Sequence, residues 1–158
     1  MFKKEARGLE VVFCVICCTI FSIIYGLTAG FIAEKITGRH CTVDFGPINA
    51  LPLIFFSASL FFSALAEEIF FRAPLVYVAS IFQSIKITLI AAAIFSIIFG
   101  MLHGGLRNIL IQGVMGFLFS MSFLKCGGFH GKVFKPLLSA TSAHFLYNFI
   151  IFFIKAGG

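Results

Sequence analysis

Long stretches of the chain carry no charged residue and are almost entirely apolar. The longest of these uncharged stretches are 11–33, 45–66, 73–85, 87–106, 108–124 and 136–154. A helix needs about 20 consecutive apolar residues to cross the hydrocarbon core of a bilayer, and several of the stretches approach or exceed that length. The pattern therefore predicts a protein that crosses the membrane several times.

These spans are expected to be helices, because backbone polar groups in lipid must be paired within the protein, as only helices and closed barrels allow. Barrel strands alternate apolar and polar residues, whereas LIFFSASLFFSALA and ITLIAAAIFSIIFG are apolar on every side. We predict an all-α, multi-pass membrane helical bundle that forms a single domain over 1–158. Its five helices are expected at about 9–33, 51–83, 86–103, 107–124 and 136–155.

Composition and charge agree with a membrane protein. The chain is 60% hydrophobic and 11% charged, which lies outside the range of soluble folds. With the N-terminus in the cytoplasm, the basic residues inside are Lys3, Lys4, Arg7, Lys86, Lys125, Lys132 and Lys135. Those outside are Lys35, Arg39, Arg107 and Lys155, which gives a weak positive-inside bias. We attribute the net charge of +6 to topology and contact with lipid, and expect no nucleic-acid partner.

The cysteines do not predict a metal site or a disulfide. Cys14, Cys17 and Cys18 lie in the first span with no His or carboxylate nearby in the sequence. Because free cysteine behaves as a small hydrophobe, packing or lipid contact is the expected role. Cys41 and Cys126 fall in loops on opposite sides of the predicted membrane, so they are not expected to pair.

Two adjacent carboxylates interrupt the second span, in the segment ALAEEIFFRAPL. Glu67 and Glu68 are the only acidic residues after Asp44. An ionised side chain at the bilayer centre costs at least about 2.5 kcal/mol, so such residues usually face the protein interior and mark a functional site. Glu68 and Arg72 are four residues apart and share a helix face, whereas Glu67 points about 100° away. We predict an ion pair between Glu68 and Arg72 that leaves Glu67 available.

Two histidines are embedded in apolar helices. His103 ends the third helix one turn after Phe99, and His144 and Asn148 are four residues apart in the last helix. Taken singly, each polar side chain could simply join helices by hydrogen bonds. Together with an unpaired glutamate within the membrane, they favour a site with chemical function.

The three groups of residues resemble the motifs of a known family. E-E-x-x-x-R at 67–72, F-x-x-x-H at 99–103 and H-x-x-x-N at 144–148 occur in the order and rough spacing of the CAAX-protease and bacteriocin-processing family, also called the CPBP or Abi family. The resemblance does not reach the first span. We therefore divide the chain into a first span and loop at 1–50 and a family-like catalytic core at 51–155.

The resemblance implies an intramembrane endopeptidase. Eukaryotic members of the family trim the last three residues from prenylated CAAX proteins, and bacterial relatives are associated with processing or bacteriocin immunity. The implied partners are the lipid bilayer and a membrane-associated peptide or protein substrate, and the implied location is the bacterial cytoplasmic membrane. Where the family often has glycine after the arginine and a small residue before the histidine, this chain has Ala73 and Leu102. Both differences are expected to affect substrate shape more than activity.

The resemblance also implies roles for individual residues. The catalytic positions that it carries over are Glu67, His103, His144 and Asn148. The first two would activate a water molecule, and the last two would stabilise the tetrahedral oxyanion. Glu68 and Arg72 would support the site by holding their helix in place.

Several alternatives stay open. Glu67, His103 and His144 could instead be the three protein ligands of a catalytic zinc ion. The chain lacks the H-E-x-x-H pairing, so a mechanism without a cofactor is preferred and a divalent metal is the second choice. A non-enzymatic immunity or binding protein, or a proton-relay subunit, would also place Glu and His within spans. Because the chain is short, a second copy or a helper membrane protein could complete the cavity wall.

Pro74 provides a direct structural test. A proline ordinarily ends a helix, and a break soon after Arg72 would leave Glu67 and His103 near opposite membrane surfaces. The catalytic interpretation therefore predicts that the second helix continues through Pro74. It also predicts that Glu67, His103 and His144 converge on one cavity.

Overall fold

The structure is a computed structural model that describes residues 6–37 and 53–156. Within those residues the secondary structure is helical and contains no strand, so the predicted all-α class is confirmed. The helices are α1 (Leu9–Thr37), α2 (Leu53–Phe82), α3 (Ile85–Leu102), α4 (Leu106–Asn108), η2 (Ile109–Gly113), α5 (Val114–Lys125), η3 (Gly128–His130) and α6 (Phe134–Ala156). Five helical segments are long and apolar enough to cross a membrane, as predicted.

The predicted helix at 107–124 is not one regular α-helix. It consists of the short α4, the π-helical turn η2 and the α-helix α5, and together these form one membrane-spanning segment. Apolar periodicity does not distinguish a π turn from an α turn, because one extra residue per turn leaves a uniformly apolar segment uniformly apolar. The other predicted helices are present, with ends that differ by a few residues.

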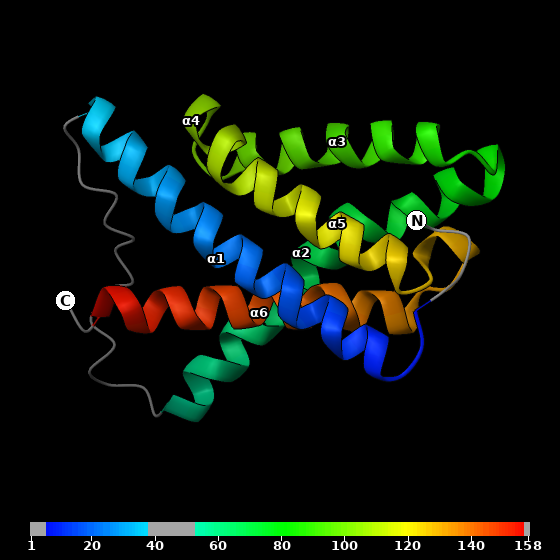
Figure 1. Cartoon of the computed structure of the whole chain (residues 1–158), viewed down its shortest axis with the longest axis horizontal. Helices are drawn as coiled ribbons and strands as arrows, with labels where there is room; N and C mark the ends of the chain where they lie inside the picture. Colours follow the sequence, from blue (N-terminus) through cyan, green and yellow to red (C-terminus); the bar gives the residue numbers. More distant parts are fainter. Residues whose placement is uncertain (1–5, 38–52, 157–158) are drawn as a thin grey trace.

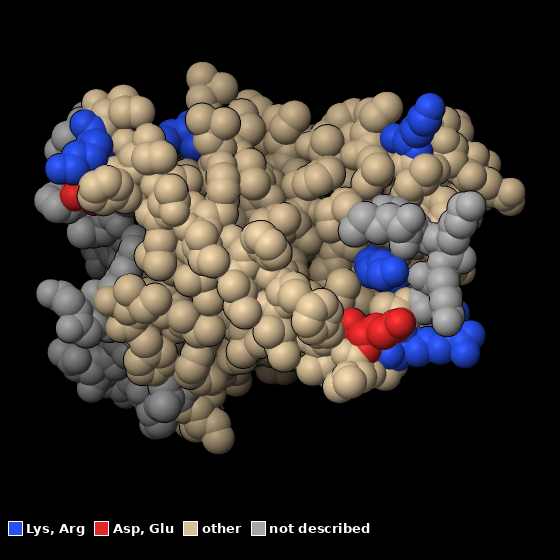
Figure 2. All heavy atoms as spheres, viewed as in Figure 1, with Lys and Arg blue, Asp and Glu red and all other residues tan. Residues whose placement is uncertain are grey.

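The bundle is built around α6. This helix packs against α1, α2 and α5, and α3 packs against α2, α5 and η2 (Figure 1). One cluster of buried residues joins α2, α3, α5 and α6, and its members are Leu75, Ala92, Phe123, Leu124 and Ala140. A second cluster joins α1 to α5 and α6, and its members are Cys18, Met115, Phe119 and Ala143. The outer surface between the two ends is uncharged on the face seen in Figure 2, as contact with lipid requires.

The two ends of the bundle are distinct. Backbone atoms of Ala6, just before α1, contact the start of the α5–α6 connection through a hydrogen bond from Ala6 N to the Lys125 carbonyl, 3.2 Å long. The last turn of α1 and the short α4 lie together at the other end (Figure 1). The start of α1 and the α5–α6 connection thus lie at one end of the bundle, and the end of α1 and α4 lie at the other, as the predicted order of spans requires. The orientation of the bundle in the membrane stays a prediction.

The cysteines behave as hydrophobic residues in this fold. Cys18 is buried in the second cluster, and Cys14 and Cys17 are half-buried on α1. Cys126 is buried at the end of α5, with its sulfur 3.1 Å from the Ser139 hydroxyl. The expectation for Cys41 lies outside the described residues.

The helix α2 continues through Pro74, as the catalytic interpretation requires. It runs from Leu53 to Phe82 with Pro74 in its interior. The missing amide of a proline is tolerated in membrane helices when neighbouring groups compensate for the lost hydrogen bond. Glu67 therefore lies near the middle of a 30-residue helix rather than at its end.

Two glycines allow α3 and η2 to approach each other at backbone distance. A methyl group at Gly100 would lie 2.6 Å from both the Asn108 carbonyl oxygen and the Ile109 Cα. A methyl group at Gly113 would lie 3.0 Å from the Ser96 carbonyl oxygen. Since the neighbouring atoms are backbone, they cannot move aside as a flexible side chain would. The π turn is therefore fixed against α3.

We expect Gly100→Ala to destabilise the protein, because the added methyl group overlaps backbone atoms of η2. Overpacking of this kind typically costs about 1–3 kcal/mol. Thermal unfolding of the purified protein in detergent measures the effect. Gly30→Ala is the matched control, since a methyl group at Gly30 meets no atom within 4 Å. A Gly100→Ala protein as stable as the Gly30→Ala protein would contradict the close backbone packing.

Candidate active site

The site begins with a buried ion pair on α2. Arg72 Nε lies 3.0 Å from Glu68 Oε2, and both side chains are almost completely buried. Arg72 also donates a hydrogen bond of 2.9 Å to the Gly116 carbonyl on α5. The centre of its guanidinium group lies 5.0 Å from the centre of the Phe99 ring on α3. The predicted Glu68–Arg72 pair is thus confirmed, and it links three helices.

His144 lies between the two adjacent carboxylates. Its Nδ1 is 2.9 Å from Glu68 Oε1, and its Nε2 is 3.7 Å from Glu67 Oε2. The ring is buried and stacks on Phe119, with the ring centres 4.7 Å apart and the planes inclined by 19°. Because a carboxylate paired with Arg72 accepts hydrogen bonds only, Nδ1 of His144 carries the hydrogen. Glu68 therefore positions two functional groups, Arg72 and His144.

His103 lies on the other side of Glu67. The distance from His103 Nε2 to Glu67 Oε2 is 3.6 Å, and His103 Nδ1 donates a hydrogen bond of 2.8 Å to the Phe99 carbonyl. The second oxygen of Glu67 accepts a hydrogen bond of 3.4 Å from the Ser63 hydroxyl. The Glu67 carboxylate raises the pKa of His103, the residue that directly follows the α3 span, although partial burial acts in the opposite direction.

The two carboxylates differ in their access to solvent. The side chain of Glu67 is 28% exposed and that of His103 is 31% exposed, whereas Glu68 is not exposed at all. The side chains of Glu67 and His103 are therefore partly accessible, whereas the ion pair behind them is enclosed. This is the division that the helical spacing of the two glutamates predicts.

All four predicted catalytic side chains border one cavity of about 190 Å³, which we call the site cavity. They are Glu67, His103, His144 and Asn148. The expected convergence of α2, α3 and α6 on a shared space is thus present. The apolar part of the wall comes mainly from Phe99, Met115 and Phe119.

A second cavity of about 450 Å³ adjoins the site cavity, and we call it the entrance cavity. The two cavities share wall residues, namely His103, Gln112, Met115, Tyr147 and Ile151. The entrance cavity reaches Glu34 near the end of α1 and Arg107 on α4. It therefore extends from the site toward the end of the bundle where these two charged residues lie.

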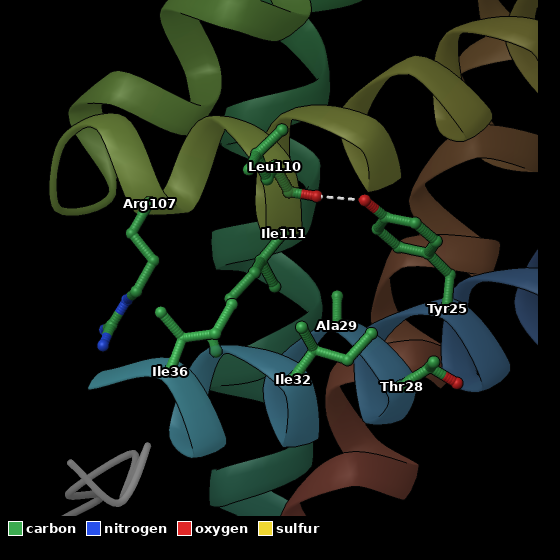
Figure 3. Close-up of a pocket in the computed structure, with 9 residues that line it drawn as sticks. Tyr25, Thr28, Ala29, Ile32, Ile36, Arg107, Leu110 and Ile111 are labelled. Carbon is green, nitrogen blue, oxygen red and sulfur yellow. Dashed lines mark hydrogen bonds between the residues drawn. The ribbon is translucent and has the colours of Figure 1, made fainter. Parts of the chain in front are cut away.

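An apolar groove of about 390 Å³ lies beside the entrance cavity, between α1 and the α4–η2 segment (Figure 3). Arg107 and Ile111 border both spaces. Tyr25 on α1 donates a hydrogen bond to the Leu110 carbonyl and so ties the two walls of the groove together (Figure 3). The rest of the wall is mostly aliphatic, with Ile32 and Ile36 on the α1 side.

Sequence reasoning missed two polar residues of the site cavity, Gln112 and Tyr147. Tyr147 is three residues after His144, so helical spacing would have placed it near the same face. Gln112 is a polar residue within the uncharged stretch 108–124. A polar residue within an uncharged stretch was a sequence signal of the same kind as the two histidines embedded in apolar helices.

A comparison with protein families supports the motif analysis. The family model described as type II CAAX prenyl endopeptidase Rce1-like matches residues 49–150, which is about two-thirds of the chain and includes all three motifs. The chain belongs to this family. No curated protein and no solved structure gives a significant match.

As a member of the Rce1-like family, the chain is a CAAX-type intramembrane protease in general terms, with the bilayer and a membrane-associated substrate as its partners. The family match starts after α1, in agreement with the limits of the motif resemblance. Location in a bacterial cytoplasmic membrane, and completion of the cavity by a second copy or a helper protein, stay predictions.

We expect Glu68→Gln to lower stability strongly, because it leaves the buried Arg72 without its charge partner. Breaking a buried ion pair on one side typically costs about 3–5 kcal/mol. The same substitution at the adjacent position, Glu67→Gln, is the matched control and should change stability little, since Glu67 is partly exposed. Thermal unfolding in detergent compares the two variants. Equal stability of both variants would contradict a structural role for Glu68.

Proposed function

We propose that this Rce1-like protein hydrolyses a peptide bond near the C-terminus of a prenylated substrate, using a water molecule activated by Glu67 and His103. The observation that supports this proposal is that Glu67, His103 and His144 border a single cavity within the membrane-spanning bundle. His103 and His144 are 36 and 77 positions away from Glu67 in the sequence. Helix packing alone does not require these three side chains to come together.

Glu67 is the proposed general base. A water molecule within hydrogen-bond distance of Glu67 Oε2 would also be near His103 Nε2, since these atoms are 3.6 Å apart. The water oxygen attacks the carbonyl carbon while one of its protons passes to Glu67. When the C–N bond breaks, Glu67 returns that proton to the leaving amine. No covalent intermediate with the enzyme is formed.

His144 and Asn148 are the proposed oxyanion donors. Both border the site cavity from the same face of α6. The Asn148 amide donates directly. Because Nδ1 of His144 already donates to Glu68, its Nε2 would donate to the oxyanion only when the ring carries both hydrogens. Each donor of this type typically contributes about 10²–10³ in rate.

The prenyl chain is the proposed occupant of the apolar groove beside the entrance cavity (Figure 3). An isoprenoid offers only apolar surface, and the groove wall is mostly aliphatic. The peptide that follows the prenylated cysteine would then enter the adjoining entrance cavity and reach Glu67. The groove thus accounts for a lipid-modified substrate.

We expect Glu67→Gln to abolish hydrolysis while leaving the fold intact, because it removes the base but preserves shape. The assay is mass spectrometry of a farnesylated CAAX peptide incubated with purified protein in detergent, with release of the last three residues as the product. Glu10→Gln, on the exposed first turn of α1, is the matched control and should retain activity. Full activity of Glu67→Gln would contradict the mechanism, and no cleavage by the wild type would favour a non-enzymatic binding, immunity or proton-relay role.

We further propose that the reaction needs no metal. A carboxylate and two imidazoles are a plausible donor set for zinc, but among the described residues no group of three or more His, Cys, Asp and Glu side chains has a metal-binding arrangement.

We therefore expect chelators such as 1,10-phenanthroline to leave cleavage of the farnesylated peptide unchanged. Elemental analysis of the active, purified protein should find no stoichiometric transition metal. A loss of activity that added zinc restores would overturn the metal-free mechanism in favour of the zinc alternative.

A further inference from the structure

Gln112 has an unusual structural position that the proposed mechanism does not use. It lies in η2, a π-helical turn between α4 and α5. Single π turns are rare and are often found at functional sites. Here the turn is fixed against α3 by the close backbone contacts at Gly100 and Gly113. The backbone that carries Gln112 is therefore held in place by its packing against α3.

The Gln112 side chain borders both the site cavity and the entrance cavity. Glu67 and Asn148 border only the site cavity, and Arg107 borders only the entrance cavity and the groove beyond it. A peptide that extends from the entrance to Glu67 must therefore pass Gln112. His103, at the end of α3, lies at the same boundary between the two cavities.

The amide oxygen of Gln112 is buried and has no hydrogen-bond partner among the described residues. An unpaired buried acceptor is unfavourable, because it has lost its hydrogen bonds to water and gained none in exchange. An apolar side chain of similar size would avoid this cost. The oxygen can accept a hydrogen bond from a substrate once the Gln112 side chain, which borders both cavities, turns it toward them.

We propose that Gln112 binds one backbone peptide group of the substrate, next to the scissile bond on the entrance side. This inference rests on the proposed function. The side-chain amide and a peptide group are complementary, since each offers one N–H donor and one C=O acceptor. Gln112 would accept from the substrate N–H through the unpaired oxygen and donate to the substrate carbonyl. Such a contact positions the peptide for Glu67 and places no demand on the substrate side chain.

The test measures binding and cleavage of a farnesylated CAAX peptide by the wild type and by Gln112→Leu, which keeps size but cannot form hydrogen bonds. Binding is measured in the Glu67→Gln background so that the peptide stays intact. We expect Gln112→Leu to bind the peptide about 10-fold more weakly, as the loss of two neutral hydrogen bonds predicts. KM should rise more than kcat falls.

Thermal unfolding distinguishes this role from a structural one. If the oxygen is unpaired in the free protein, Gln112→Leu should be at least as stable as the wild type although it binds the peptide less well. Weaker binding that accompanies a loss of stability would overturn the inference.

A series of peptides in which an ester replaces one amide at a time identifies the contact. The ester that replaces the contacted amide lacks the N–H group that donates a hydrogen bond to Gln112. This one ester should weaken binding to the wild type and have little further effect on binding to Gln112→Leu. Unchanged binding by Gln112→Leu, or additive losses for every ester, would overturn the inference while wild-type cleavage still supports the proposed function. Conversely, Gln112-dependent binding without cleavage would support the inference and overturn the hydrolytic function. Failure of the wild type to bind the peptide at all would overturn both.

Discussion

The buried contact between Glu68 and Arg72 is the interaction on which the rest of the site depends. Two charges without solvent access are tolerable only when each is matched by its neighbours. Arg72 is held by Glu68, by the Gly116 carbonyl and by the face of the Phe99 ring, while the second oxygen of Glu68 holds His144. A local pair on one helix thereby fixes α3, α5 and α6 relative to α2. The contacts that match these two buried charges therefore also set the geometry of the site.

The two adjacent glutamates have separate roles because of their environments. Glu68 is enclosed and contacts Arg72 with one oxygen and His144 with the other, whereas Glu67 is partly exposed and borders the site cavity. Both nevertheless contact the same imidazole, so His144 couples the structural carboxylate to the exposed one. A change at the buried pair would therefore alter the orientation of His144 as well as the stability of the bundle.

Local spacing in the sequence predicted much of this structure, and long-range packing accounts for the rest. The apolar stretches predicted the five spans, and the four-residue spacing predicted the Glu68–Arg72 pair, because both are properties of a single helix. The contact between His144 and Glu68 joins residues 76 positions apart and has no local signal. The π turn at Ile109–Gly113 was also missed, since it depends on the close approach of α3.

The entrance cavity extends toward only one end of the bundle. Its charged wall residues, Glu34 and Arg107, lie where α1 finishes and α4 begins, whereas Ala6 is bound to Lys125 at the other end. A substrate that enters through this cavity would come from the compartment that this end of the bundle faces. The same chain inserted in the opposite orientation would keep the same site residues and meet a different set of substrates. Under the proposed function, the lysines that bias orientation, such as Lys125 at the far end of the bundle, would influence substrate choice without touching any substrate.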